Sequence, residues 1–253
     1  MKKKLENIAW VTGASEGIGC ALIKQLAAAG WTVAATSRTG KKLSELAKQE
    51  TSGAIHPFPG DITLTNKMEM LVAAIEKELG TIDLAILNAG THIPITGKTF
   101  SVESVRELVE TNLMGTVNCL NPVLKRFIQR RSGTIAVVSS LAGYRGLPTS
   151  AGYGATKAAL INMCEALKPE LDQFGVSLHL INPGFVKTPL TNKNTFPMPF
   201  LITADRAARE ILTGLKRSKF EITFPFSFSV IMKFIRIIPD RLFFVFSRKL
   251  IGK

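Results

Sequence analysis

The stretch from residue 8 to residue 19 reads Ile8-Ala9-Trp10-Val11-Thr12-Gly13-Ala14-Ser15-Glu16-Gly17-Ile18-Gly19. Its first five residues are typical of a buried strand, and residues 20–29 after it are typical of an apolar helix. A glycine turn between a strand and a helix is the context in which a dinucleotide binds. Gly13 allows the tight turn, Gly17 lets the backbone approach a pyrophosphate, and Gly19 lets helix and strand pack closely. The amino end of the helix also attracts the anion.

The rest of the chain alternates between strand-like and helix-like segments. Its further strand-like segments are 32–37, 55–59, 84–88, 134–139, 176–181 and 220–224. This alternation predicts an α/β protein with a doubly wound parallel sheet, a Rossmann fold in three α/β/α layers. The length of 253 residues suits one domain, and 46% hydrophobic with 20% charged residues excludes disorder. We expect a catalytic domain over residues 1–224 and an amphipathic extension over 225–253.

Tyr153 and Lys157 lie four residues apart on one predicted helix, so their side chains share a face. A fixed ammonium beside a phenol favours the phenolate and lowers its pKa from about 10 toward neutrality. A phenol with that pKa can act as general acid or base on a carbonyl or an alcohol. The pair alone is also typical of an ordinary solvated helix face, so its meaning depends on a cofactor site elsewhere in the chain.

Four motifs together resemble those of the short-chain dehydrogenases/reductases, and the resemblance runs from about residue 8 to residue 224. The glycine turn from Thr12 to Gly19 is similar to the T-G-x-x-x-G-x-G loop of that family. The other matches are Asn88-Ala89-Gly90, a catalytic tetrad of Asn112, Ser140, Tyr153 and Lys157, and Pro183-Gly184 followed by Thr188. The resemblance implies the Rossmann fold and hydride transfer between a nicotinamide cofactor and a carbonyl or alcohol.

The resemblance also implies a role for each member of the tetrad. Tyr153 is expected to donate the proton in reduction and to accept it in oxidation. Lys157 lowers the pKa of the phenol and binds the nicotinamide ribose, and Ser140 polarises the substrate oxygen. Ser139 is the rival for that last role, although the spacing to Tyr153 favours Ser140. Asn112 is expected to anchor a water that relays protons from the lysine to solvent.

The residues after the second strand favour NADP(H) over NAD. Ser37 stands where NAD-selective members of the family carry an acid, and Arg38 beside it can donate two hydrogen bonds to a phosphate. Thr39 is a further candidate, whereas Glu16 stands where many NADP-binding relatives carry a second basic residue. The alternative is that Arg38 is an ordinary surface arginine.

The expected cofactor site draws on every motif. The resemblance implies that Asp61 binds the adenine amino group and that Thr188 binds the nicotinamide carboxamide. The full expected set is Gly13, Ser15, Gly17, Ile18, Gly19, Ser37, Arg38, Asp61, Ile62, Asn88, Ala89, Gly90, Tyr153, Lys157, Pro183, Gly184, Val186 and Thr188.

The cysteines and histidines predict no metal site. Cys20, Cys119 and Cys164 are scattered over separate predicted helices, which indicates buried, reduced thiols rather than disulfides. The three histidines lack ligand spacing, and His92 is interpreted as a loop residue that could line the pocket. Residues 2–4 are lysines, but residues 5–12 lack the features of a signal peptide, so we expect an uncleaved, cytoplasmic chain.

The segment 189–202 stands where the family has its substrate lid, and it is rich in apolar residues such as Phe196, Phe200 and Leu201. Apolar side chains over a site indicate a hydrophobic substrate. Core packing at the edge of the loop is the alternative interpretation.

The extension after residue 224 is both apolar and basic. From Lys216 onward nine basic and two acidic residues give a net charge of +7, out of +13 for the whole chain. Pro239 divides the extension, and neither part reaches the roughly 20 apolar residues of a membrane span. We expect two amphipathic helices that lie on a membrane, with Lys233 and Arg236 on one basic face and Arg241 and Arg248 on another. A helical arm on a partner subunit is the alternative, and nucleic acid binding is not expected because no recognition module is present.

The sequence therefore predicts an NADP(H)-dependent oxidoreductase for a hydrophobic, lipid-like carbonyl or alcohol. It is expected to be a homodimer or homotetramer, cytoplasmic or peripheral on the inner face of a membrane. The alternative is a non-catalytic NADP-binding scaffold or sensor at a membrane, although a scaffold has no need of Tyr153 and Lys157 together.

Overall fold

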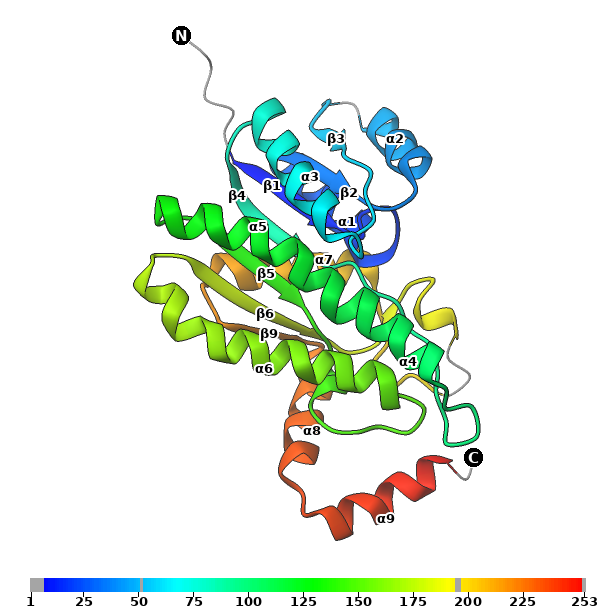
Figure 1. Cartoon of the computed structure of the whole chain (residues 1–253). Coiled ribbons are helices and arrows are strands. Elements are labelled where there is room, and N and C mark those ends of the chain that lie inside the picture. Colours follow the sequence, from blue (N-terminus) through cyan, green and yellow to red (C-terminus); the bar gives the residue numbers. More distant parts are fainter. Residues whose placement is uncertain (1–6, 51, 194–196, 252–253) are drawn as a thin grey trace.

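A seven-stranded parallel sheet forms the centre of the protein, in a computed structural model that describes residues 7–50, 52–193 and 197–251. The strand order is β3-β2-β1-β4-β5-β6-β9 (Figure 1). The strands are β1 (Ile8–Thr12), β2 (Thr32–Thr36), β3 (Ile55–Pro57), β4 (Ile82–Leu87), β5 (Thr134–Val138), β6 (Ser177–Pro183) and β9 (Glu221–Phe224). Two short strands, β7 (Val186–Lys187) and β8 (Ile202–Thr203), pair with each other. Every predicted strand is present, with its ends moved by at most two residues.

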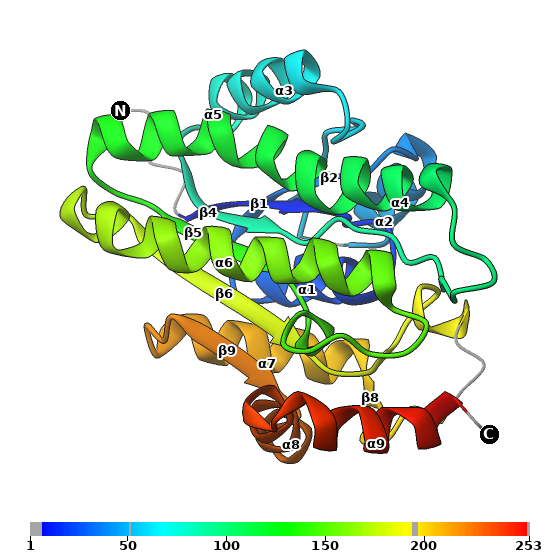
Figure 2. The same cartoon turned by 60° about the horizontal axis from the view of Figure 1, so that its bottom comes forward.

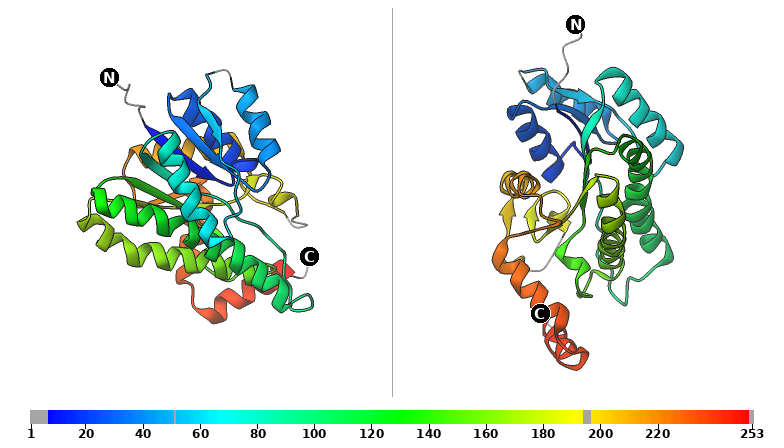
Figure 3. Two further views of the ribbon diagram at one scale, coloured as in Figure 1. Left: turned by 45° about the horizontal axis from the view of Figure 1, so that its top comes forward. Right: turned by 90° about the vertical axis from the view of Figure 1, so that its left-hand side faces the viewer.

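Helices cover both faces of the sheet, so the predicted three-layer Rossmann fold is confirmed (Figure 3). One face carries α1 (Gly17–Ala28), α2 (Gly40–Gln49) and α7 (Ala204–Lys216); the other carries α3 (Thr65–Glu78), α5 (Gly115–Arg130) and α6 (Ala151–Gln173). The shorter elements are α4 (Val102–Leu108), a π-helical turn η1 (Val109–Met114) that joins it to α5, and two 3₁₀ turns, η2 (Leu141–Gly143) and η3 (Thr191–Lys193).

The side chains of the central strand β1 alternate between two hydrophobic cores, one on each face of the sheet. Ile8 and Trp10 belong to the core beneath α3, α5 and α6, whereas Ala9 and Val11 belong to the core beneath α1 and α7. A strand that is buried on both faces needs an uninterrupted apolar run. The Trp10 indole keeps its polar atom satisfied by donating a hydrogen bond of 2.9 Å to the Thr36 hydroxyl.

The strand order also fixes where a ligand can bind. The chain moves from β1 to β2 and β3 on one side and then returns to β4 on the other side of β1. The loops after β1 and β4 therefore diverge and leave a crevice at the carboxyl ends of the strands. The glycine turn after β1 lies at this switch point.

The three cysteines are free thiols. Cys119 and Cys164 are buried as predicted, but Cys20 is partly exposed because it lies in the first turns of α1, where the helix passes the edge of the loop. Among the described residues, no cluster of histidine, cysteine and carboxylate side chains is placed to hold a metal ion.

Two helices, α8 (Phe226–Ile237) and α9 (Asp240–Ile251), follow β9 and project from the body of the protein (Figures 1 and 2). They are the two helices that the sequence predicts, and they begin two residues after β9 ends at Phe224. Within the described part of the chain, every helix is too short or too polar to cross a bilayer.

The two cations on α8 have partners in the body of the protein that the sequence did not reveal. The Lys233 ammonium lies 2.6 Å from the Glu221 carboxylate of β9, and the Arg236 guanidinium lies 5.7 Å from the centre of the Tyr144 ring. Both groups turn toward the body because a carboxylate and an aromatic face are available there.

Candidate active site

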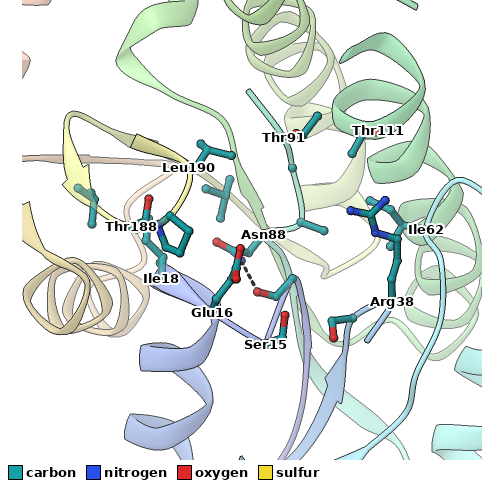
Figure 4. Close-up of a pocket in the computed structure, with 18 of the residues that line it drawn as sticks. Ser15, Glu16, Ile18, Arg38, Ile62, Asn88, Thr91, Thr111, Thr188 and Leu190 are labelled. Atoms are coloured by element: carbon teal, nitrogen blue, oxygen red, sulfur yellow. Dashed lines mark hydrogen bonds between the residues drawn. The ribbon is translucent and has the colours of Figure 1, made fainter. Parts of the chain in front are cut away.

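A cavity of about 500 Å³ opens at the carboxyl ends of the strands and brings together residues from every predicted motif. Figure 4 shows Arg38 and Ile62 on one side of it and Thr188 and Leu190 on the other. Most residues of the expected site line its wall. They are Gly13, Ser15, Gly17, Ile18, Ser37, Arg38, Asp61, Ile62, Asn88, Ala89, Gly90, Ser140, Tyr153, Lys157, Pro183, Gly184, Val186 and Thr188. Gly19 and Asn112 lie behind the wall.

The glycine turn has the backbone that the sequence predicts. Gly13 and Gly17 have φ angles of +66° and +56°, a region that side chains disfavour. A Cβ atom on Gly19 would lie 2.1 Å from the carbonyl oxygen of Gly13, so Gly19 lets α1 start directly against the turn. The amino end of α1, at Gly17, therefore faces the cavity with its free backbone N–H groups.

Asn88-Ala89-Gly90 fastens the end of β4 to the end of β1. The Thr12 hydroxyl accepts hydrogen bonds from the backbone N–H groups of Asn88 and Ala89, at 3.0 and 3.1 Å. The Asn88 side-chain amide donates to the Thr12 carbonyl at 3.1 Å. These bonds hold the two diverging loops at a fixed separation, so the motif shapes the cavity besides lining it.

Arg38 and Asp61 face each other at the far end of the cavity. Burial acts to raise the pKa of Asp61, but hydrogen bonds from Thr63 and the nearby Arg38 charge outweigh it and hold that pKa below its usual value. The two Thr63 donors, its N–H and its hydroxyl, lie 3.0 and 2.8 Å from Asp61 Oδ1. Asp61 is therefore a fixed, ionised acceptor.

Lys42 is a second cation in the wall that the sequence did not reveal. It lies in the first turn of α2, and its ammonium is 3.4 Å from the Glu16 carboxylate. Glu16 is the residue that counted against NADP(H), and this ion pair partly neutralises it. The spacing of four residues between Arg38 and Lys42 was the available signal, but α2 starts only at Gly40.

Lys157 is buried at the base of the cavity with 4% of its surface exposed. Its ammonium donates a hydrogen bond of 3.0 Å to the Val138 carbonyl. Burial lowers its pKa from 10.5 to about 8. The lysine is fixed in place by α6 and by the end of β5.

Tyr153 shows a pKa shift in the direction opposite to the one expected from the sequence. Burial raises the pKa of the phenol, and a hydrogen bond with Ser140 lowers it in part. Lys157 does not lower the pKa of Tyr153 as expected. Its ammonium is 5.6 Å from the centre of the tyrosine ring and donates its hydrogen bond to the Val138 carbonyl instead. His92, interpreted above as a loop residue, is buried with its ring edge-on to Tyr153 at 4.8 Å between centroids.

The two neighbouring serines have different partners. Ser139 is buried, and its hydroxyl donates to the Lys157 carbonyl at 2.8 Å, which supports α6. The Ser140 hydroxyl accepts from the Ala142 N–H at 3.1 Å and is hydrogen-bonded to Tyr153. The geometry therefore favours Ser140 as the serine that acts on a substrate oxygen.

Asn112 is fully buried in the π-helical turn η1. Its side chain accepts from the Thr91 N–H at 2.7 Å and donates to the Thr91 carbonyl at 3.0 Å. Such turns occur frequently at functional sites because they redirect one backbone group. Here the side chain holds the loop after β4, which carries Gly90 and passes beside Lys157.

The expected lid is only partly a wall of the cavity. Pro189 and Leu190 line it, whereas the Phe200 ring stacks on Phe228 of α8 at 6.0 Å. Phe196 lies outside the described residues. The wall residues that the sequence did not single out are Lys42, Gly60, Thr63, Thr91, Glu107, Thr111 and Val138. They come from helices, a strand end and loops that only the fold brings together.

Comparisons with known proteins agree with this site. The sequence model of the short chain dehydrogenase family matches residues 7–197. An uncharacterized oxidoreductase of Myxococcus xanthus is 36% identical over 244 residues, 96% of both chains. The ketoacyl reductase HetN of Nostoc sp. is 30% identical over 218 residues, 84% of this chain and 76% of that protein.

A solved structure shows the same fold. The short-chain dehydrogenase from Sphingobium yanoikuyae in complex with NADPH has a TM-score of 0.79 at 23% identity, covering 87% of this chain and 88% of that one. This chain belongs to the short-chain dehydrogenase family. It is an oxidoreductase of that family.

Proposed function

We propose that this protein transfers a hydride between NADP(H) and the carbonyl or alcohol of a hydrophobic, lipid-like substrate. The observation that carries the proposal is the placement of Ser140, Tyr153 and Lys157 in one cavity with the glycine turn. The cationic pair at the far end of that cavity, Arg38 and Lys42, supports the choice of cofactor.

The residues of the cavity fit a dinucleotide phosphate. Gly13 and Gly17 present bare backbone, and the N–H groups of the first turn of α1 face the same space. The Asp61 carboxylate stands at the adenine end and Thr188 at the nicotinamide end. The whole set therefore matches the polar groups of such a cofactor along its length.

NADP(H) is favoured over NAD by charge. The Arg38 guanidinium can bind a ribose phosphate in a bidentate manner, and Lys42 adds a second positive charge. Position 37 is occupied by a serine. Unlike a carboxylate at this position, its hydroxyl does not repel a ribose phosphate. The NADPH complex of the Sphingobium relative is consistent with this choice.

The side chains near Lys157 supply the proton chemistry. When bound, the cofactor supplies or accepts the hydride. Tyr153 is the proton donor in reduction, and its raised pKa keeps the phenol protonated at neutral pH. Ser140 donates a hydrogen bond to the substrate oxygen. Lys157 binds the ribose and holds positive charge near the phenol, and Asn112 fixes the loop beside it and is proposed to anchor the proton relay.

The hydrophobic part of the substrate is placed against Pro189 and Leu190, the apolar residues of the wall on the lid side. The name of the Nostoc relative, a ketoacyl reductase, is consistent with a keto group on an acyl chain as substrate. We further propose a homodimer or homotetramer assembled through α6 and its neighbour α5, to be measured by analytical ultracentrifugation.

The test is NADPH oxidation at 340 nm against a panel of long-chain ketones, aldehydes and 3-ketoacyl thioesters. Turnover with NADPH and a loss of roughly 10²- to 10⁴-fold in Tyr153→Phe are expected, because the variant removes the general acid. NADPH binding in that variant, followed by fluorescence, serves as the control for an intact site. Binding without turnover across the panel would instead support a non-catalytic scaffold.

A further inference from the structure

An apolar stripe runs along the outer side of α8. Phe226, Val230, Phe234 and Ile237 are spaced as one helical face, and they are 81%, 51%, 63% and 75% exposed. The inner side of the same helix carries the buried Ser229 and Met232. Contiguous large apolar side chains at this exposure mark a surface that binds something.

The cations of α8 do not interrupt this stripe. Lys233 pairs with Glu221 at 2.6 Å, and Arg236 lies over the Tyr144 ring. Both contacts direct the charged groups toward the body of the protein. The four residues of the stripe are therefore flanked, and not interrupted, by these two cations.

Helix α9 continues the surface and adds exposed charge to it. Its residues Leu242, Val245 and Phe246 are 55%, 54% and 60% exposed. Arg241 and Arg248, two turns apart, are exposed beside them.

The opposite side of α9 is anchored to the body. Phe243 is buried under the Arg145 guanidinium, 4.5 Å from the ring centre. Asp240 forms an ion pair with the same arginine. These contacts fix the helix so that the apolar and basic residues face outward.

We infer that the outer surface of α8 and α9 docks on an anionic membrane, with both helices lying in the plane of the interface. Each helix has 12 residues and is about 18 Å long, against roughly 30 Å for a hydrocarbon core. Apolar side chains would enter the headgroup boundary, and Arg241 and Arg248 would contact the lipid phosphates. The anionic cytoplasmic leaflet is the surface that this charge fits.

Charge complementarity favours a membrane over a second copy of the chain. Residues 225–253 contain six basic residues and one acidic residue, Asp240, whose carboxylate is paired with Arg145. A two-fold contact would place this surface against itself. The like charges of the two copies would then repel, whereas anionic headgroups would attract them.

The docking surface is joined to the cavity through one aromatic side chain. On the inner side of α8 the Phe228 ring stacks on Phe185 at 5.4 Å and on Phe200 at 6.0 Å. A Cβ atom on Gly184, in the cavity wall, would lie 2.7 Å from Phe228 Cδ1. Docking thus brings Phe200, which packs on Phe228, close to the membrane, which suits a lipid-like substrate; this last step rests on the proposed function.

Vesicle flotation of the full-length protein tests the docking without reference to activity. One set of vesicles contains phosphatidylcholine with 25% phosphatidylglycerol, and the other contains phosphatidylcholine alone. The variant Phe226→Gln/Val230→Gln/Phe234→Gln removes the stripe, and Leu64→Gln/Met70→Gln is its control near α3, where both residues are exposed. NADPH binding in each variant reports an intact fold.

The wild-type protein and the α3 control are expected to float with the anionic vesicles, and the stripe variant is expected to stay in solution. Arg241→Gln/Arg248→Gln should weaken binding about thirtyfold, from roughly a fivefold effect of each charge near the surface. Equal partition of wild type and stripe variant, or equal binding to both kinds of vesicle, would refute the inference. A stripe variant that turns a dimer into a monomer while the wild type ignores vesicles would show a second copy as the occupant and also refute it.

Discussion

The Lys157 ammonium donates a hydrogen bond of 3.0 Å to the carbonyl oxygen of Val138, the last residue of β5. This one backbone bond holds a nearly fully buried side chain whose pKa burial lowers to about 8. A charged lysine at that position destabilises the folded protein at neutral pH.

Lys157→Met is expected to raise the stability of the cofactor-free protein relative to wild type at pH 7. The pKa is lower in the folded chain than its ordinary 10.5, so the folded state binds fewer protons between these values. Wild-type stability from this group therefore rises as the pH increases from about 8 to 10.5, by up to about 3 kcal/mol. Urea unfolding of both proteins at pH 7 and pH 10 measures the difference.

Lys216→Met, at the exposed end of α7, is the control, and its stability relative to wild type should be the same at both pH values. The lead of Lys157→Met over wild type should be smaller at pH 10 than at pH 7, and a lead that is equal or larger at pH 10 would contradict the lowered pKa. The variant should also lose turnover, because it removes the ammonium that we propose binds the ribose.

The fold could be predicted from local pattern because the signals lie in continuous stretches. The strand of Ile8 to Thr12 and the glycines after it specify their own geometry, and Gly19 packs against Gly13 only six residues away. The placement of the tetrad followed from resemblance and spacing. Each of these depends on neighbours along the chain.

What the sequence missed depends on burial and on contacts between distant segments. Lys42 forms an ion pair with Glu16, which lies 26 residues away in the sequence. Lys233 forms one with Glu221, and the hydrophobic pattern does not predict how the chain turns between β9 and α8. The pKa of Tyr153 rises because the site is buried, an effect that outweighs the proximity of Lys157 in the chain. The direction of a side chain and the cost of burial are properties of the folded protein.

Arg38→Ala and Lys42→Ala are expected to weaken NADPH binding and to leave NADH binding within about twofold. Loss of a hydrogen bond to a charged group costs about 1.5–3 kcal/mol, or roughly ten- to a hundredfold in Kd for Arg38. Lys42 should contribute less because it is shared with Glu16. Isothermal titration with both cofactors measures the effect.

Lys41→Ala is the matched control, since Lys41 is exposed beside Lys42 and lies outside the cavity wall. If Arg38→Ala lost the same affinity for NADPH and for NADH, the arginine would not be binding the ribose phosphate. In that case NAD would become the better candidate for the cofactor.

Gly19→Ala is expected to abolish binding of either cofactor. Its Cβ atom would lie 2.1 Å from the Gly13 carbonyl, and backbone cannot yield as a flexible side chain does. The turn must then move away from α1. Gly97→Ala is the control because a Cβ atom there meets open space. Cofactor fluorescence titration of the two variants compares them, and tight binding by Gly19→Ala would contradict the packing.

The Glu221 carboxylate is the shared acceptor that joins α8 to Tyr144, which follows η2, and to Asn182 of β6. It accepts hydrogen bonds from the Tyr144 hydroxyl, from the Asn182 amide at 2.9 Å and from the Lys233 ammonium at 2.6 Å. Burial acts to raise its pKa, but these donors and the lysine charge outweigh burial and lower it. A lowered carboxyl pKa contributes stability at neutral pH that is lost as the pH falls through the folded value.

Glu221→Gln is expected to destabilise the protein by about 1–3 kcal/mol at pH 7, because the amide leaves the buried tyrosine and the lysine with a weaker acceptor. The gap should begin to narrow below about pH 4.5, where the unfolded carboxyl is protonated, and should close only as the pH falls through the lower pKa of the folded carboxyl. Urea unfolding over a series of pH values from 7 downward measures it. Glu210→Gln, an exposed carboxylate 3.9 Å from Arg206 on α7, should change stability by less than about 0.5 kcal/mol. A gap that stays constant with pH would show that Glu221 acts through packing and not through its charge.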